Sequence, residues 1–377
     1  MRVTFADSTL ARQAGRFVWL ELNFDNPANR EFLVHHGVAY TPTMLVLDPG
    51  GERATASHLG GMTASELTRF LDRGAQGVRG PARSPADSAL ARGDEFLGRG
   101  LTSEAAAGYR AALRLAAPGW SERGHALAQL TWALMAERDG RACAELAAAQ
   151  APRMPHDGDF VRVVLAGLTA ANQADSAAWG ASARATLVPL AAQAIEVREA
   201  TRDHRFQLHQ ALMIEAANRN DRATVTRWGE RWLREIEAVT PGNDDERTAL
   251  DVARVDVVGI MGSPERVLTA LQASERAMPG NYNASLRLAQ VEADAGRYDE
   301  SLAACDRGLA HVDGPIGRTW LLETKAQVWM AKSEPDSARR ALEVARRSAG
   351  EISTPSNRDN NLQRISRMMT EVDRAAR

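Results

Sequence analysis

The spacing of apolar residues divides the chain into a short mixed segment and a long helical one. Between residues 17 and 59 apolar residues come in short runs, and beyond residue 87 they recur at the three- and four-residue spacing of amphipathic helices. A stretch rich in Gly, Pro and Arg at residues 74–87 separates the two patterns. The sequence therefore predicts a mainly α-helical protein: a partial α/β unit at 1–75, a linker at 76–86, a helical array at 87–350 and a capping helix or tail at 351–377.

The first 75 residues change their hydrophobic period several times. Residues 9–16 have the pattern of the end of a helix, and the apolar run Phe17 to Phe24 predicts a mostly buried strand. The predicted elements that follow are a helix, a strand, a turn, a strand and a closing helix: 30–36, 44–47, 48–51, 54–59 and 65–73. Thr63 or Ser65 is the expected N-cap of the closing helix.

Several short motifs in this segment occur in a recognisable order. Gly37-Val38, Thr41-Pro42-Thr43, Gly50-Gly51 and Gly60 follow one another between the predicted elements, and together they resemble the second half of a thioredoxin domain. The resemblance implies a cis bond between Thr41 and Pro42, in a loop whose backbone holds an extended peptide. Thr41 and Pro42 are therefore the expected peptide-binding residues. The alternative is an ordinary turn proline at the start of a strand.

The sequence lacks the catalytic motif of the thioredoxin family. The family carries Cys-x-x-Cys at a helix start, where the helix N-terminus lowers the thiol pKa; this chain has two isolated cysteines, Cys143 and Cys305. Both are expected to be small buried hydrophobes, and no catalytic residue or cofactor is predicted. The central strand of the family's sheet is also absent, so we expect Met1 to be an internal methionine of a longer reading frame.

Small and aromatic residues recur at fixed offsets in the helical part. The turn region of one copy, Ala295 to Leu302, resembles the turn of tetratricopeptide repeats, and five copies share the pattern. The signature positions are Gly93, Gly100, Ala105 and Tyr109 in the first copy, Ala289, Gly296 and Tyr298 in the fourth, and Ala338 in the fifth. The second copy is predicted at Leu130, Ala133, Glu137, Ala142, Leu146 and Ala149. Two degenerate hairpins are expected near 161–184 and 206–232; the alternative is a generic Ala-rich bundle.

Charge and motif content exclude several functional classes. Lys+Arg number 46 against Asp+Glu 48, a parity that argues against a nucleic-acid surface. No run approaches the ~20 apolar residues of a membrane span. His204 and His209 miss the i, i+4 spacing of helical metal pairs, so no metal site is predicted. The expected inner-face positions, such as Asp87, Leu90 and Asp94, carry no basic clamp for a carboxylate.

These observations favour a non-catalytic scaffold that binds a protein or peptide in the groove of the repeats. The combination resembles bacterial thioredoxin-family fusions to tetratricopeptide repeats, in which the repeats hold a client or a chaperone. That resemblance implies the bacterial cytoplasm or periplasm, with any signal peptide upstream of Met1. The alternative is a thiol–disulfide oxidoreductase whose cysteine pair lies upstream, and a third possibility is a peptide holder that uses the Thr41–Pro42 edge.

Overall fold

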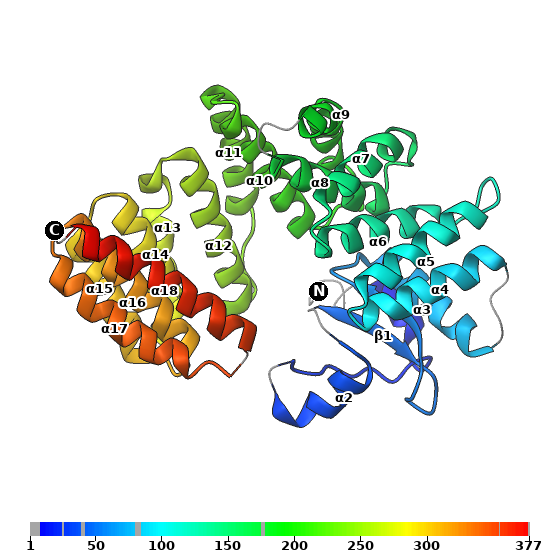
Figure 1. The fold of residues 1–377 in the computed structure, drawn as a ribbon, viewed down its shortest axis with the longest axis horizontal. Coiled ribbons are helices and arrows are strands. Elements are labelled where there is room, and N and C mark those ends of the chain that lie inside the picture. The colour runs from blue at the N-terminus through cyan, green and yellow to red at the C-terminus, as the bar shows by residue number, and fades with distance from the viewer. Residues whose placement is uncertain are drawn as a thin grey trace. The chain divides into compact units, whose positions relative to one another are not determined.

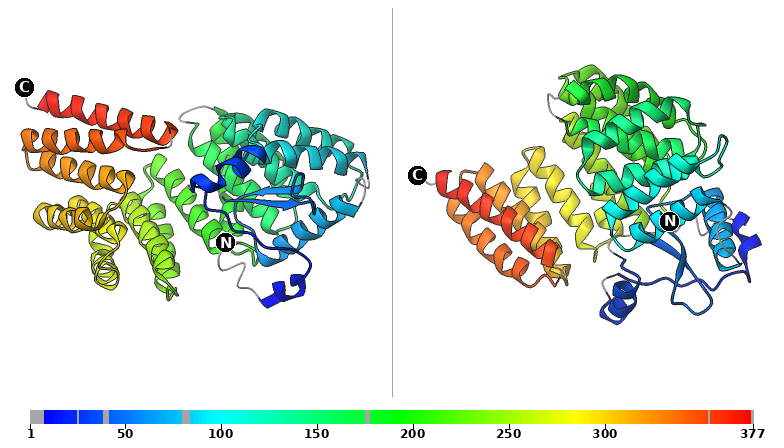
Figure 2. Two further views of the ribbon diagram at one scale, coloured as in Figure 1. Left: turned by 90° about the horizontal axis from the view of Figure 1, so that it is seen from below. Right: turned by 45° about the vertical axis from the view of Figure 1, so that its right-hand side comes forward.

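The computed structural model describes residues 8–24, 26–38, 42–79, 84–174, 178–353 and 355–375 (Figure 1). The chain divides into two compact units, residues 1–219 and 220–377. Helices dominate both units, as the hydrophobic spacing predicts (Figure 2). The prediction of a mainly α-helical, tetratricopeptide-like protein is confirmed.

Residues 43–79 form a β-hairpin followed by a long helix. Strand β1 (Thr43–Leu47) pairs antiparallel with β2 (Ala54–Leu59), and α3 (Ala64–Arg79) packs against both. Thr63 caps α3 through a capping box, in which its hydroxyl accepts the Glu66 N–H while the Glu66 carboxylate accepts the Thr63 N–H. The two predicted strands and the closing helix are confirmed, and Thr63 is the cap.

Helix α3 continues to Arg79, into the stretch predicted as a linker. Gly74 and Gly77 suggested a break in the sequence, yet both lie within the helix. A Cβ atom on Gly74 would stand 2.5 Å from Val46, and one on Gly77 would stand 3.1 Å from Thr55. These glycines therefore let α3 lie closely against the hairpin.

The predicted strand at residues 17–24 is wrong. This segment has no regular secondary structure, and Val18 and Leu20 are 88% and 74% exposed. A strand is stable only when a neighbouring strand satisfies its backbone groups, and β1 pairs with β2 alone among the described residues. The predicted helix end at 9–16 is a 3₁₀ helix, η1 (Ser8–Gln13). The predicted helix at 30–36 is confirmed as α2 (Arg30–His35), and the 3₁₀ turn η2 (Pro27–Asn29) precedes it.

The resemblance to thioredoxin receives no support from the sheet. The described residues contain one two-stranded antiparallel sheet and no parallel pairing. The small core of this region consists of apolar side chains from η1, the two strands and α3, together with Met62: Leu10, Val46, Ala56, Met62, Leu67, Phe70 and Leu71. Residues 43–79 therefore form a hairpin-and-helix layer rather than a recognisable half of a larger sheet.

The rest of unit 1 is built from helices that pair in sequence order. They are α4 (Pro85–Gly98), α5 (Thr102–Leu115), α6 (Arg123–Ala136), α7 (Gly140–Gln150), η3 (Ala151–Arg153), α8 (Gly158–Asn172), α9 (Ala178–Ala194) and α10 (Arg202–Asn218). Helix α4 packs on α5, α6 on α7 and α8 on α9, while α6 also contacts α4 and α8, and α8 contacts α10. The first helices of successive pairs thus form a row, which we call the inner row: α4, α6, α8 and α10.

Unit 2 repeats this plan. Its helices are α11 (Arg222–Glu237), α12 (Asp244–Met261), η4 (Pro264–Arg266), α13 (Leu268–Ala277), α14 (Tyr282–Asp294), α15 (Tyr298–His311), α16 (Pro315–Ala331), α17 (Pro335–Gly350) and α18 (Pro355–Ala375). Helix α18 lies beside α17 (Figure 2) and buries Ile365 and Val372 against it, so the predicted capping helix is present. Of the expected hairpin near 206–232, α10 ends unit 1 and α11 begins unit 2.

Several turns between consecutive helices share one backbone conformation. A residue with positive φ stands two positions before the second helix or its leading 3₁₀ turn: Gly100, Arg138, Asn220, Gly262, Gly296 and Ser333. Arg138 is therefore the equivalent of Gly100, one residue later than the predicted Glu137. The shifted register places Cys143 and Ala147, both fully buried, at the helix contact in place of Ala142 and Leu146. The predicted second copy is thus displaced by one residue, and its turn carries Arg138 where three of the other turns carry glycine.

At two of these turn positions the residue has a side chain that makes the left-handed backbone conformation unfavourable. Arg138 has φ 61° and Ser333 has φ 61°, and both side chains are exposed. We expect Arg138→Gly and Ser333→Gly each to raise the free energy of unfolding by about 0.5–1 kcal/mol, since glycine adopts this conformation without strain. Gly296→Ala, at φ 73°, should lower it by about 1 kcal/mol. Urea denaturation of the three variants measures both signs, and a destabilised Arg138→Gly would contradict the argument.

Candidate functional site: two faces of the first helical hairpins

The inner row of unit 1 is covered by the chain's own hairpin-and-helix layer. Strand β2 packs along α4, and α3 reaches α6 and α8 through ion pairs. The approach is close, because a Cβ atom on Gly98 would stand 2.6 Å from the Ser57 hydroxyl. In helical repeat proteins the corresponding face usually binds partners. Here residues 43–79 occupy it over the first hairpins.

Ion pairs, one group of them buried and one partly buried, hold α3 on the inner row. Arg162 of α8 donates to Glu66 of α3 at 2.8 Å and also to Asp159, and the three side chains are 15%, 4% and 10% exposed. Arg73 of α3 pairs with Glu122, the residue before α6. Gly158 leaves room for the Glu66 carboxylate at the start of α8. One guanidinium thus neutralises two carboxylates that come from different elements.

A second polar cluster connects β2 with α4, α5 and α6. The Nδ1 atom of His58 lies 3.0 Å from the Gln129 amide nitrogen, and the His58 ring stacks on that of His125 at 6.1 Å. His125 Nε2 lies 3.3 Å from Asp94, which also accepts the Tyr109 hydroxyl at 3.0 Å. All five side chains are buried. The cluster therefore joins the hairpin to the first two helix pairs through hydrogen bonds between buried polar side chains.

Burial shifts the pKa values of these groups in opposite directions. Desolvation lowers the pKa of His58 and His125 well below the usual value, with nearby guanidinium groups adding to the effect. Desolvation also lowers the pKa of His204 on α10 to about 4, and it raises the pKa of Asp94 to about 7. The folded state therefore holds the three histidines neutral and favours the protonated form of Asp94 near neutral pH.

We expect unit 1 to lose stability as the pH falls from 6.5 towards 4. The unfolded histidines bind protons in this window while the folded ones cannot, so their contribution is lost as the pH falls. Asp94 acts in the opposite sense, because its raised pKa gives stability that is present at low pH and lost as the pH rises to about 7. Asp94→Asn should therefore steepen the loss at low pH. Hydrogen exchange of the backbone amides of α3 and α8 at pH 7 and pH 5 measures this loss of stability. Equal protection factors at the two pH values would contradict the expectation.

The second helices of unit 1 leave a groove on the other face. A cavity of about 490 Å³ lies between α5 and α7, with α6 as its floor. Leu127, Leu130 and Leu134 of α6 form that floor, and they are nearly fully buried. Arg110 and Arg114 of α5 and Arg123 of α6 add basic groups to its lining. We call this feature the outer groove.

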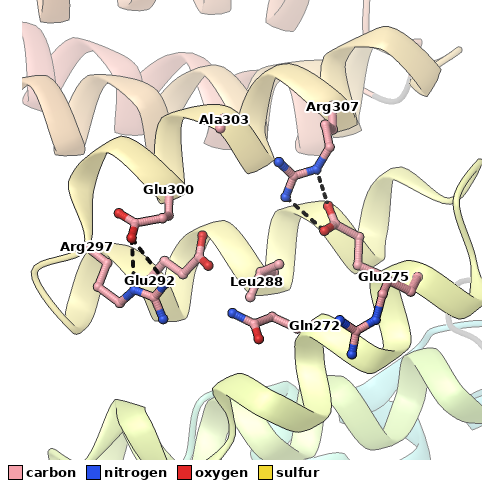
Figure 3. A pocket seen from close by; sticks show the side chains of 9 residues that line it. Gln272, Glu275, Leu288, Glu292, Arg297, Glu300, Ala303 and Arg307 are labelled. Atoms are coloured by element: carbon pink, nitrogen blue, oxygen red, sulfur yellow. Dashed lines mark hydrogen bonds and ion pairs between the residues drawn. The ribbon is translucent and has the colours of Figure 1, made fainter.

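The corresponding place in unit 2 also holds a cavity, of about 260 Å³, between α13, α14 and α15 (Figure 3). Its lining holds three arginines and three glutamates, which balance in number. Arg307 donates to both carboxylate oxygens of Glu275 at 3.0 and 2.8 Å, and Arg297 pairs with Glu300 at 3.1 Å. Burial raises the pKa of Glu292, which lies between these pairs. The two cavities therefore share a position in the repeat and differ in charge.

The predicted repeat-signature residues lie at turns and helix contacts. Tyr109 fills the space over Gly93, where a Cβ atom would stand 2.8 Å from the ring. The other small signature residues are turn glycines with positive φ or fully buried alanines: Gly100, Gly296, Ala105, Ala289 and Ala338. Tyr298 is half-buried as the first residue of α15. These residues shape the helix pairs and lie apart from either charged cluster, except for Tyr109.

The predicted peptide-binding pair is placed only in part. Thr41 and the Thr41–Pro42 bond lie outside the described residues. Pro42 is exposed, and its carbonyl accepts the Gly60 N–H at 2.9 Å at the end of the hairpin. Cys143 and Cys305 are fully buried on separate helices, and burial raises the pKa of each thiol to about 12.

Neither a metal cluster nor a membrane segment emerges from the described residues. No group of three or more His, Cys, Asp or Glu side chains there has a geometry that could hold a metal ion. The helices of the described ranges are all too short or too polar to cross a bilayer.

Comparison with known proteins supports the fold. No family model and no curated protein sequence matches the chain. A tetratricopeptide repeat protein from Parabacteroides merdae superimposes with a TM-score of 0.50 at 8% identity, over 76% of this chain and 98% of that one. The TPR2AB domain of yeast Sti1 in complex with pHSP90 gives a TM-score of 0.30 at 15% identity, over 76% of this chain and 98% of the other. The assembly chaperone of RpL4, Acl4, gives 0.35 at 14%, over 77% and 99%. The class that the fold defines is a tetratricopeptide-like helical array.

Sequence reasoning missed both charged features. The capping box Thr63-x-x-Glu66 was visible, but nothing in the sequence indicates that Glu66 meets Arg162, a residue 96 positions away. Arg110 and Arg114 are four residues apart, which places them on one side of a helix. That spacing could have indicated a basic surface on α5, since no residue of α5 offers either arginine a carboxylate three or four positions away.

Proposed function

We propose that the chain is a non-catalytic protein-interaction scaffold whose tetratricopeptide-like hairpins bind a polypeptide partner. The observation that carries the proposal is the inner row of unit 1, which already holds a polypeptide layer through ion pairs, the His58–Gln129 contact and the packing of β2 on α4. The surface of the array is thus suited to recognising protein. In this proposal residues 87–350 are the array, 1–75 an appended unit whose last helix continues to Arg79, and 351–377 the cap.

The alternative function, thiol–disulfide exchange, requires a cysteine pair that this sequence lacks. Thiol exchange needs an accessible thiolate, whereas Cys143 and Cys305 are buried and their thiol pKa values are raised to about 12. An oxidoreductase role therefore requires a cysteine pair outside this sequence. We also propose kinship with bacterial thioredoxin-family fusions, on the sequence resemblance alone, which makes a chaperone one candidate partner.

The exposed end of the β-hairpin is a second candidate surface for peptide binding. Its basis is the sequence resemblance that names Thr41 and Pro42, together with the exposure of Pro42. Pro42→Ala in the full chain is the variant that separates this edge from the helical array. A binding loss in that variant would assign the peptide to the edge.

The scaffold function is tested with the full chain immobilised against a library of random 16-residue peptides. We expect some peptides to bind saturably and to compete with one another for the chain. Their binding should not depend on reducing agent. A library without any saturable binder would contradict the proposal. Insulin reduction by the same preparation, with Ellman titration of native thiols, tests the alternative, and we expect neither turnover nor a reactive thiol.

A further inference from the structure

The outer groove has the apolar floor and basic lining of a helix-binding surface. Leu113 of α5 and Leu146 of α7 stand on its walls, both half-buried, above the buried leucines of α6. The floor runs from Arg123 to Leu134, which corresponds to about 17 Å of helix, or about three turns. A groove of this length accommodates a short amphipathic helix that presents anchors at i, i+3, i+4 and i+7.

The charge of the groove decides which helix fits. Arg110 and Arg114 are exposed, and neither forms an ion pair among the described residues, while Arg123 donates only to the Gln150 amide oxygen at 3.3 Å. Glu145, the one carboxylate in the lining, is paired with Arg141. The formal net charge of the whole chain is -2, so this excess of positive charge is local. Carboxylates on a partner would find unpaired guanidinium groups at the edge of an apolar floor.

The equivalent cavity of unit 2 provides a comparison within the same chain. There, the lining holds three arginines and three glutamates, and two of the arginines are paired with Glu275 and Glu300 (Figure 3). The same repeat position is thus balanced in charge in one unit and basic in the other.

We propose that the outer groove between α5, α6 and α7 binds an acidic amphipathic helix of a partner polypeptide. The proposal rests on the scaffold function and names the chemistry of one partner surface. Leucine-type side chains of the partner helix enter the groove between the half-buried Leu113 and Leu146, above the buried leucines of α6. Carboxylates flanking that apolar stripe pair with Arg110 and Arg114, which are one helical turn apart.

The test uses fluorescence anisotropy with the full chain and a labelled 16-residue helical peptide. The peptide carries leucines on one face and glutamates on both flanks, and the comparison peptide replaces every glutamate by lysine. We expect the glutamate peptide to bind at least tenfold more tightly, and Arg110→Glu/Arg114→Glu to weaken its binding at least tenfold. Arg297→Ala/Arg307→Ala, which removes the paired arginines of unit 2, is the matched control and should leave the dissociation constant unchanged.

Leu113→Asp separates groove binding from attraction by charge alone. We expect it to weaken binding as strongly as the arginine variant, with the circular dichroism of each variant unchanged. Equal binding of the two peptides, or full binding by either groove variant, would overturn the proposal. Self-association that the glutamate peptide cannot displace would instead assign the groove to a second copy of the chain. If library-derived peptides bind and the glutamate peptide does not, the scaffold function stands and this inference fails.

Discussion

Arg162→Met is expected to lower the free energy of unfolding of unit 1 by about 3–5 kcal/mol. The guanidinium of Arg162 is the shared cation of Glu66 and Asp159, whose side chains are 4% and 10% exposed. Removing it leaves two carboxylates side by side in a region of low polarity. Because Glu66 also caps α3, the loss should loosen that helix before the rest of the unit. Urea denaturation, with hydrogen exchange of residues 64–79, measures both effects.

The matched control is Arg141→Met, which removes an exposed ion pair with Glu145 on α7. Its partners are 66% and 51% exposed, so we expect a change of at most ~0.5 kcal/mol. Glu66→Gln combined with Arg162→Met should recover part of the lost stability, since one unpaired carboxylate is removed. If Arg162→Met behaves like Arg141→Met, the ion pair does not hold α3 on the inner row.

Tyr109→Ala is expected to cost about 3–5 kcal/mol, the second large effect. The Tyr109 ring is fully buried over Gly93, and its hydroxyl donates to Asp94 at 3.0 Å. Alanine leaves a cavity between α4 and α5 and also removes a hydrogen bond from a buried carboxyl. Thermal and urea denaturation of the full chain give the change in stability, read from probes in α4 and α5.

Two further tyrosine variants divide this effect into its parts. Tyr109→Phe keeps the ring and should cost about 1–3 kcal/mol, because the Asp94 carboxyl loses its donor. Tyr298→Ala changes a half-buried tyrosine in unit 2 and should cost about 1 kcal/mol. A Tyr109→Phe variant as unstable as Tyr109→Ala would show that the hydroxyl, rather than the ring, accounts for the effect.

Local pattern determined much of the fold before any tertiary contact was known. The apolar run at 44–47 and the segment at 54–59, on either side of a Gly-rich turn, predicted β1 and β2, and turn glycines placed the copies around Gly100 and Gly296. At Arg138, where the turn lacks glycine, the register slipped by one residue. Backbone conformation at that position depends on the helices it joins, and an arginine gives no sign of it.

Apolar character misled where burial depends on a partner. Residues 17–24 have the composition of a buried strand, but no described strand pairs with them, and their side chains are largely exposed. Gly74 and Gly77 were interpreted as linker residues because glycine usually interrupts helices. Contact with Val46 and Thr55 makes them helix residues instead.

The sequence by itself determined that this is an array of paired helices with a small β-hairpin near its start, because periodicity and turn residues are local properties. Only the tertiary structure decided that α3 and β2 cover the inner row, and that Arg162 is buried between Glu66 and Asp159. It also decided that Arg110 and Arg114 line an apolar groove and form no ion pair within the part of the chain that the structure describes. Whether such charges form ion pairs depends on residues far apart in the sequence, which a local sequence pattern cannot predict.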